Sequence, residues 1–222
     1  MDVGAIKLAE DWPHLAVLRE CLAEIPDDAW QSVHPDGVKA STEWKAARFY
    51  RKKGTPMPLL EQVPKIREAL EFFECPILGA AFNVMGPGAW IGPHRDMSGT
   101  LEWGRIRLHV PVVTNPGVDF RVGGERVVMK EGELWALNAS HRHSVRNDGD
   151  EARIHFIVEA VVNDWVRELL PPKGIKYYLN ATRFFAHATR HVVTSSVRDP
   201  RYLRVASRLT RRYVLGQGDP VN

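Results

Sequence analysis

The segment Pro93-His94-Arg95-Asp96 contains two residue types that commonly bind metal ions, and it follows a stretch rich in glycine and proline. In an extended strand, residues i and i+2 point to the same side. We therefore expect His94 and Asp96 to direct an imidazole nitrogen and a carboxylate at one point. Two histidines and one carboxylate form the facial triad that binds non-haem Fe(II) and leaves neighbouring coordination sites open. A histidine from a distant strand would complete such a site.

Two downstream histidines, His141 and His143, are candidates for this third ligand. They also stand at i and i+2, at the end of a run that resembles a strand, so strand parity leaves both candidates open. The sequence Asn147-Asp148-Gly149 follows and is typical of a turn that reverses a strand. These residues together predict a metal centre built from segments about fifty residues apart.

Arg153 opens the next strand-like run, and strand alternation places it on one face with His155 and Ile157. An arginine that points into an apolar barrel is energetically costly unless an anion meets it. The planar guanidinium can bind a carboxylate through two hydrogen bonds, so a dicarboxylic acid would be a suitable partner. The alternative is an ion pair within the protein, with Glu159 or Asp119.

The elements that must position these residues form three zones. Residues 1 to about 75 show helical spacing in two stretches, 15–25 and 63–73, with a short strand expected at 46–50. From about 77 to 162, short runs rich in valine, isoleucine and aromatic residues alternate with turn residues. We expect strands at 77–85, 106–113, 118–122, 126–129, 134–137 and 153–162. The pattern predicts a mainly β fold with flanking helices, whose core is a jelly roll or double-stranded β-helix.

The C-terminal part is strongly basic. From Arg167 onward there are 11 Lys or Arg against 3 acidic residues, whereas the rest of the chain carries 19 against 24. Helical spacing returns after Pro172, and within 201–213 one face would carry tyrosine, valine and leucine beside a face of arginines. We expect a single oxygenase-sized domain over 1–165 and a basic helical extension over 166–222. The extension would hold an anionic surface or carrier, cover the pocket, or form a dimer interface.

Composition excludes several classes of protein. The sequence shows no apolar run of the roughly 20 residues that a membrane helix needs. Its N-terminus lacks a basic region followed by an apolar stretch, which predicts that there is no signal peptide. The two cysteines, Cys21 and Cys75, are too few for a disulfide framework. We expect a cytoplasmic protein that binds a small-molecule substrate and no nucleic acid.

Four motifs occur together in order: Pro93-His94-Arg95-Asp96, Arg107-Leu108-His109-Val110-Pro111, Gly132-Glu133 through His143, and Arg153-Ile154-His155-Phe156. The stretch from Gly86 to Asn163 that contains them resembles the aspartyl/asparaginyl β-hydroxylase domain family, and in particular its bacterial proline cis-hydroxylases. In that family the distal histidine ligand precedes the arginine that binds 2-oxoglutarate by ten positions. The resemblance therefore selects His143, ten residues before Arg153, rather than His141.

The resemblance implies an Fe(II)- and 2-oxoglutarate-dependent hydroxylase with His94, Asp96 and His143 as metal ligands and Arg153 as the cosubstrate anchor. It also implies that Arg107 and His109 lie near the cosubstrate, although a histidine satisfied within the core is the alternative for His109. His141 is expected outside the ligand set, either behind the ligands or exposed. Candidates for the substrate pocket are Arg95, Trp90, Trp103, Trp135 and His155.

The expected substrate is an amino acid or a related molecule, and the resemblance also allows a lipid or glycan acyl group. A different class of protein, a non-redox cupin-like isomerase or binding protein, is the rival interpretation. Such a protein has no need of an arginine ten residues beyond the distal ligand, so succinate production from 2-oxoglutarate would separate the two classes.

Overall fold

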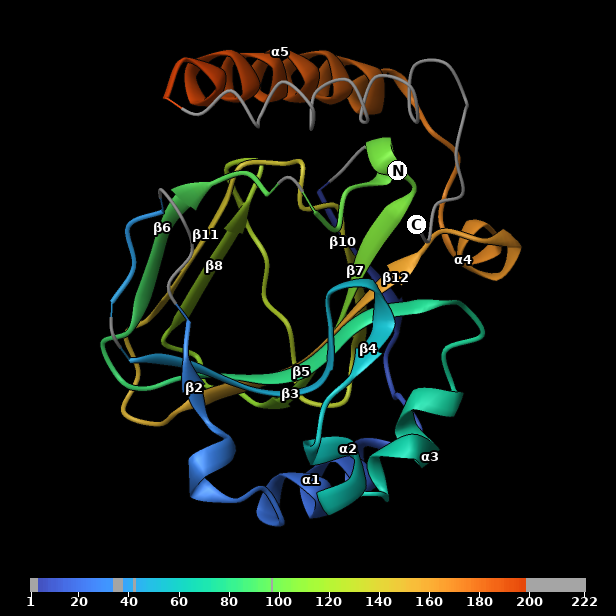
Figure 1. The fold of residues 1–222 in the computed structure, drawn as a ribbon, viewed down its shortest axis with the longest axis vertical. Coiled ribbons are helices and arrows are strands. Elements are labelled where there is room, and N and C mark those ends of the chain that lie inside the picture. Colours follow the sequence, from blue (N-terminus) through green and yellow to red (C-terminus); the bar gives the residue numbers. More distant parts are fainter. Residues whose placement is uncertain (1–3, 34–37, 42, 97, 199–222) are drawn as a thin grey trace.

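The computed structural model describes residues 4–33, 38–41, 43–96 and 98–198 (Figure 1). Its strands are β1 (Ala5–Ala9), β2 (Gln31–Ser32), β3 (Trp44–Arg51), β4 (Thr55–Pro56), β5 (Ile77–Met85), β6 (Trp90–His94), β7 (Arg105–Val113), β8 (Val118–Val122), β9 (Glu125–Arg126), β10 (Leu134–Leu137), β11 (His143–Asn147) and β12 (Arg153–Val161). Its α-helices are α1 (Leu15–Ala23), α2 (Leu59–Gln62), α3 (Ile66–Glu71), α4 (Asp164–Leu169) and α5 (Ile175–Arg198). Short 3₁₀ turns occupy Asp27–Ala29, Lys52–Gly54 and Leu101–Trp103.

The strands form two antiparallel sheets that face each other as a jelly roll, which confirms the predicted fold class. The larger sheet has eight strands in the order β1-β10-β7-β12-β5-β3-β2, with β4 paired to β3. The smaller has four, in the order β6-β11-β8-β9. Figure 1 shows the helices α1, α2 and α3 beneath the large sheet, while α5 lies across the end of the barrel where β6 terminates.

The two faces of the large sheet have different compositions because side chains alternate along each strand. On the outer face, apolar residues such as Phe156, Leu108 and Phe82 pack against α1, α2 and α3 in the main hydrophobic cluster. On the inner face, β12 presents Arg153 and β7 presents His109, both buried. Helices thus cover the outer face of the large sheet, and polar side chains on its inner face point into the barrel.

Most of the predicted strands are confirmed, with three differences. The run at 126–129 is a strand only as far as Arg126, where β9 ends. The strands β1, β2, β4 and β11 were missed, although in β1 the apolar side chains Ile6 and Leu8 alternate with Lys7. The turn at Asn147-Asp148-Gly149 joins β11 of the small sheet to β12 of the large sheet, so it crosses between sheets and does not form a hairpin.

The buried side chain of Asn147 holds this crossing in place. Its amide donates to the carbonyls of Met85, Gly86 and Glu151, at 3.0, 3.1 and 2.8 Å. The close packing continues at Gly117, where a Cβ would lie 2.5 Å from the backbone nitrogen of Gly149. The start of β12 is therefore fixed against both β5 and the loop before β8.

The predicted helical C-terminal region begins with α4 and α5, and the predicted face at 201–213 lies outside the described residues. Among the helices that the structure describes, none is both long enough and apolar enough to pass through a bilayer.

Candidate metal centre

The two histidines predicted as ligands are direct neighbours across the small sheet. His94 is the last residue of β6 and His143 the first of β11, and the antiparallel register pairs them with each other. Their ring centroids are 4.2 Å apart. The next pair along the strands is Val145 with Ile91, so two residues of β6, Gly92 and Pro93, lie opposite the single residue Ser144 of β11. This bulge sets the pairing of His94 with His143. The extra residue lets Ile91 and His94 both face the barrel interior.

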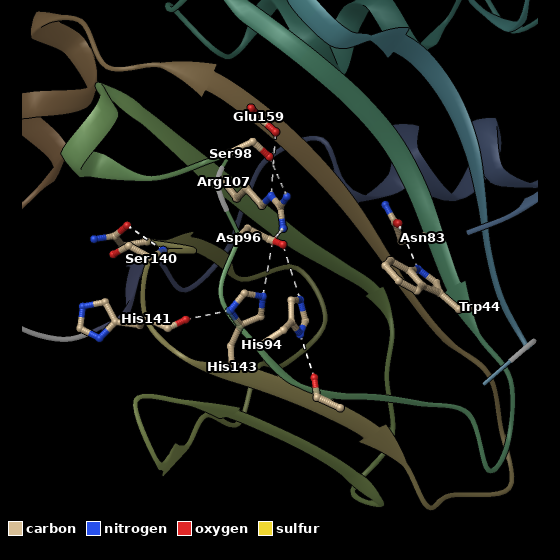
Figure 2. A network of polar contacts seen from close by, with 12 residues as sticks. Trp44, Asn83, His94, Asp96, Ser98, Arg107, Ser140, His141, His143 and Glu159 are labelled. Atoms are coloured by element: carbon tan, nitrogen blue, oxygen red, sulfur yellow. Dashed lines mark hydrogen bonds and ion pairs between the residues drawn. The ribbon is translucent and has the colours of Figure 1, made fainter. Parts of the chain in front are cut away.

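Asp96 completes the cluster from the segment that follows β6. The strand ends at His94, so the two residues converge without the continuous extended strand that we expected. The backbone N–H of Asp96 donates to the carbonyl of Ala139 at 3.0 Å, in the loop that leads to His143. Ligand atoms from His94, Asp96 and His143 all lie within 4.8 Å of one another. Figure 2 shows both imidazoles directed toward the Asp96 carboxylate.

The hydrogen bonds of the two rings determine which nitrogen faces the cluster. Nδ1 of His94 lies 2.8 Å from the carbonyl of Gly92, and Nδ1 of His143 lies 2.9 Å from the carbonyl of His141. A carbonyl only accepts, so each Nδ1 carries the hydrogen and each Nε2 keeps its lone pair. Both Nε2 atoms lie 3.6 Å from an Asp96 oxygen. This distance suits two ligands of one ion with bonds of about 2.1 Å.

The charge states of these groups also favour a cation. Burial lowers the pKa of His94, which keeps its imidazole neutral. Burial alone would raise the pKa of the Asp96 carboxyl, but the guanidinium of Arg107 and the neighbouring His143 and His94 together outweigh burial and hold that pKa well below its usual range. A neutral imidazole and an ionised carboxylate are the protonation states that metal ligation requires. The residues therefore fit a divalent ion.

Arg107 forms an ion pair with Asp96, the carboxylate of this cluster. Its Nη1 forms a short ion pair with Oδ2 of Asp96, and Nη2 lies 3.4 Å from the hydroxyl of Ser98 (Figure 2). Its Nε is 4.0 Å from Glu159, a carboxylate that also pairs with Arg105 at 3.6 Å. The guanidinium thus neutralises the acid of the metal site from the inner face of the large sheet.

Arg153 is buried, with 4% of its surface exposed, and has no carboxylate partner among the described residues. Glu159 pairs with Arg105 and Arg107, and Asp119 with Arg121 and Arg126, so neither provides the internal ion pair considered above. The guanidinium lies 2.9 Å from Nδ1 of His155, 3.8 Å from Sδ of Met85 and 5.9 Å from the centre of the Phe120 ring. Burial accordingly lowers the pKa of Arg153.

Unpartnered polar atoms surround this guanidinium. Nε of Arg153, Nε2 of His155 and both ring nitrogens of His109 are buried without a hydrogen-bond partner in the described part of the chain. The rings of His109 and His155 are 5.8 Å apart, and a cavity lined by Phe120 and Thr114 reaches Arg153 and His155. Buried polar atoms are normally satisfied. An organic anion such as a dicarboxylate fits this group of atoms.

The other predicted pocket residues lie in different environments. Trp90 is 39% exposed and borders an open surface groove with Asp119 and Arg146. Trp103 is buried against Phe184 of α5, with ring centroids 5.2 Å apart. Arg95 hydrogen-bonds Ser140 and Asn180, so its guanidinium points toward α5. Trp135 donates to Glu133 at 2.8 Å from the inner face of β10, opposite His109 in register.

His141 is buried and lies outside the ligand cluster, and its backbone carbonyl is what orients His143. Sequence reasoning missed Ser98, Glu102, Ser140 and Asn180, which surround the site. The sequence held one signal for Asn180. It lies at helical spacing from the apolar residues Tyr177, Phe184 and Ala188, so it is a polar residue on the buried face of α5.

Comparisons with known proteins give a family match and a similar fold. The family model described as aspartyl/asparaginyl beta-hydroxylase matches residues 14–162. A search of curated proteins finds no match. Among solved structures, a 2OG-Fe(II) oxygenase family oxidoreductase from Burkholderia pseudomallei is similar with a TM-score of 0.50 and 18% identity, covering 72% of this chain and 88% of that one.

Two further solved structures are similar at a lower level. A prolyl-4-hydroxylase from Pseudomonas putida has a TM-score of 0.48 and 13% identity, over 72% of this chain and 94% of that one. HygX from Streptomyces hygroscopicus, solved with nickel and 2-oxoglutarate bound, has a TM-score of 0.49 and 10% identity, over 73% and 84%. At these identities the Burkholderia structure supports the fold alone.

Proposed function

Because the chain belongs to the aspartyl/asparaginyl β-hydroxylase family, we propose that it hydroxylates an unactivated C–H bond of an amino acid or an amino-acid-like molecule. Membership of this family makes the chain a 2-oxoglutarate-dependent hydroxylase that uses Fe(II). The substrate class rests on the family's description, and the residues of the site rest on the geometry given above.

In this proposal His94, Asp96 and His143 hold the Fe(II). The observation that carries the assignment is the orientation of the two rings, whose Nδ1 hydrogens are engaged by backbone carbonyls while both Nε2 lone pairs face one carboxylate. Hydrogen bonding of the second ring nitrogen is the usual way in which a protein orients a histidine ligand. Arg107 and the neighbouring His143 and His94 favour the ionised form of Asp96, and an ionised acid is the form that binds a metal.

The polar atoms deeper in the barrel would hold the cosubstrate. Arg153 would bind the distal carboxylate of 2-oxoglutarate, since its guanidinium has no carboxylate partner among the described residues. His109 and His155 line the same space with unpartnered nitrogens. Burial, followed by the charge of Arg153, holds the pKa of both histidines well below the usual range, so they remain neutral.

When bound, Fe(II) and 2-oxoglutarate supply the oxidation: one oxygen atom of O2 enters the substrate as hydroxyl, and the other enters succinate as CO2 is released. The protein contributes position and exclusion of water. The apolar residues Phe120, Met85 and Val145 in the barrel interior would keep the reacting groups away from bulk solvent.

The experiment that tests this proposal measures succinate formed from 2-oxoglutarate in the presence of Fe(II) and O2. We expect succinate from the wild type and almost none from Asp96→Asn, which keeps a hydrogen-bond acceptor for Arg107 but removes the charge of the ligand. Hydroxylated product from a panel of free and peptide-linked amino acids would then identify the substrate. A wild type that binds metal without producing succinate would favour a non-redox cupin-like protein instead.

A second substrate class is favoured by the outer face of α5. The exposed side chains on this helix include Ile175, Tyr178, Leu179, Phe185 and Val193. No acidic residue occurs between Leu169 and Arg198, and lysines and arginines flank the apolar ones. A basic amphipathic helix of this kind binds anionic surfaces, which would suit an acyl-chain substrate. Co-sedimentation with vesicles containing anionic lipid, weakening as salt is raised, would support this class over free amino acids.

A further inference from the structure

The helix α5 lies beyond residues 14–162, the part of the chain that the family model matches, yet it contacts Arg95 and Ser140 in the two segments that carry the proposed ligands. Its buried residues Tyr177, Asn180, Phe184 and Ala188 recur at helical spacing and face the barrel. Phe184 and Ala188 form a small apolar cluster with Trp103. The helix is therefore anchored by apolar contacts on either side of a single buried amide, that of Asn180.

Asn180 is 7% exposed and uses both ends of its amide. Its Oδ1 accepts a hydrogen bond from Nη1 of Arg95 at 3.0 Å. Its Nδ2 donates to the hydroxyl of Ser140 at 2.8 Å and to Oε1 of Glu102 at 3.3 Å. One side chain of α5 thus joins three residues, Arg95, Glu102 and Ser140, whose segments are distant from the helix in sequence.

Two of these segments carry the proposed ligands. Arg95 stands between His94 and Asp96, and Ser140 lies three residues before His143 in the loop that also provides the carbonyl of His141. Arg95 donates a short hydrogen bond to the carbonyl of Ser140 as well. The amide of Asn180 therefore braces the segment of His94 and Asp96 against the loop of His143.

The remaining contacts make this a closed network with little water access. Glu102 accepts from the Ser140 hydroxyl at 2.9 Å and from the Asn138 amide at 3.3 Å. Asn138 in turn accepts from the backbone N–H groups of Leu101 and Ser140 at 3.1 and 3.3 Å. Ser140 and Asn138 are buried. Among these polar atoms of the described residues, Oε2 of Glu102 is buried without a hydrogen-bond partner, whereas the amides of Asn138 and Asn180 each use both of their ends. Buried hydrogen bonds of this kind restrict the geometry of the groups that they join.

We propose that Asn180 is a positioning residue of the metal centre, and that α5 is thereby a working part of the hydroxylase site. This inference rests on the proposed ligand set. It assigns Asn180 no contact with metal, cosubstrate or substrate. Loss of the amide would leave the hydrogen bond from Arg95 to the Ser140 carbonyl as the remaining direct link between the two segments. Residues behind metal ligands typically change metal affinity by about 10–100-fold.

The test compares binding of Co(II) by the full-length wild type, Asn180→Ala and Leu179→Ala, with titration followed by the visible d–d absorption of the ion. Leu179 is the matched control, because it is adjacent on α5 but exposed. We expect Asn180→Ala to bind Co(II) about 10–100-fold more weakly and to show an altered absorption spectrum at saturation. We expect Leu179→Ala to match the wild type in both respects.

A second pair of variants separates positioning from general loss of structure. In Asn180→Asp a carboxylate would face Glu102, and adding Glu102→Gln restores one donor and one acceptor across that contact. The double variant should regain Co(II) affinity relative to Asn180→Asp alone, and this comparison also covers the case in which Asn180→Ala fails to fold.

The outcomes are distinguishable. Equal affinity and an unchanged Co(II) spectrum in folded Asn180→Ala would overturn the positioning role and leave the proposed hydroxylase intact. A double variant that binds no better than Asn180→Asp would also overturn it. A wild type that binds no Co(II) would overturn the proposed metal centre together with this inference.

Discussion

Replacement of Arg153 by methionine tests whether its buried guanidinium lacks an anionic partner in the cosubstrate-free protein. The contacts of Arg153 are one hydrogen bond to His155, a long contact to Met85 and the Phe120 ring. A buried charge costs several kcal/mol to desolvate. The hydrogen bond returns about 1.5–3 kcal/mol and the ring about 2 kcal/mol. The desolvation cost of the guanidinium is therefore about equal to, or larger than, the stabilisation from its hydrogen bond and its aromatic contact.

We therefore expect Arg153→Met to leave the free energy of unfolding unchanged or to raise it by about 1–4 kcal/mol, as when buried ions are replaced by apolar side chains. Urea unfolding without 2-oxoglutarate measures this value, with the exposed Arg51→Met as control. With Mn(II) present, 2-oxoglutarate at 100 times its dissociation constant should stabilise the wild type by about 2.7 kcal/mol and the variant hardly at all.

Two results would refute this reasoning. A loss of about 3–5 kcal/mol in Arg153→Met without cosubstrate is the effect of breaking a buried ion pair, and it would mean that an acid within the protein neutralises Arg153. Equal stabilisation of variant and wild type by 2-oxoglutarate would mean that the distal carboxylate binds elsewhere.

Three further predictions follow from the same site and its surroundings. His143→Ala should reduce succinate formation by at least about 100-fold, whereas His141→Ala should keep most of it because alanine retains the backbone carbonyl that orients His143; the reverse order would show that the ligand is His141. Burial and then the charge of Arg153 lower the folded-state pKa of His109 and His155, so their stabilising contribution is complete above the unfolded pKa near 6.5. Urea unfolding from pH 7 to 5 should show the free energy of unfolding falling by up to about 1.4 kcal/mol per pH unit for each histidine, and a slope that is the same in His109→Gln would contradict this. Burial raises the pKa of the Cys75 thiol to about 12, so at pH 8 iodoacetamide should label Cys75 only in urea, as read by mass spectrometry, and rapid labelling of the folded protein would disagree.

Much of the strand pattern could be predicted from the sequence because the longer strands of the large sheet have one face on the helices. That asymmetry imposes alternation, as in β12, where Phe156 and Val158 pack outward while Arg153 and His155 face inward. The length of β9 was overestimated because Val127 to Met129 have strand-forming side chains, whereas the pairing with β8 ends at Arg126 and continues only in the hydrogen bond from the Val127 N–H to the Phe120 carbonyl.

The details of the site depended on information that a single sequence does not hold. The pairing of His94 with His143 is set by register and by the bulge in β6, and neither leaves a local signature. The pairing of Arg107 with Asp96 depends on which strands adjoin across the barrel. The placement of Asn180 depends on where α5 packs, which the periodicity of the helix restricts to one face but does not assign to a neighbour.

The crossing at Asn147 has a consequence for the length of molecule that the barrel accepts. His143 begins one sheet's strand and Arg153 the other's, and the amide of Asn147 holds the turn between them to β5. If His143 binds the metal ion and Arg153 the distal carboxylate, as we propose, this stretch of backbone would set the length of keto acid that the site accepts. Inserting one residue between Asn147 and Arg153 would lengthen the loop and leave Arg153 on the same side of β12, because the buried outer face of β12 fixes its register with β5 and β7. The relative binding of homologous keto acids one carbon longer or shorter than 2-oxoglutarate would show how strictly the distance between His143 and Arg153 is fixed.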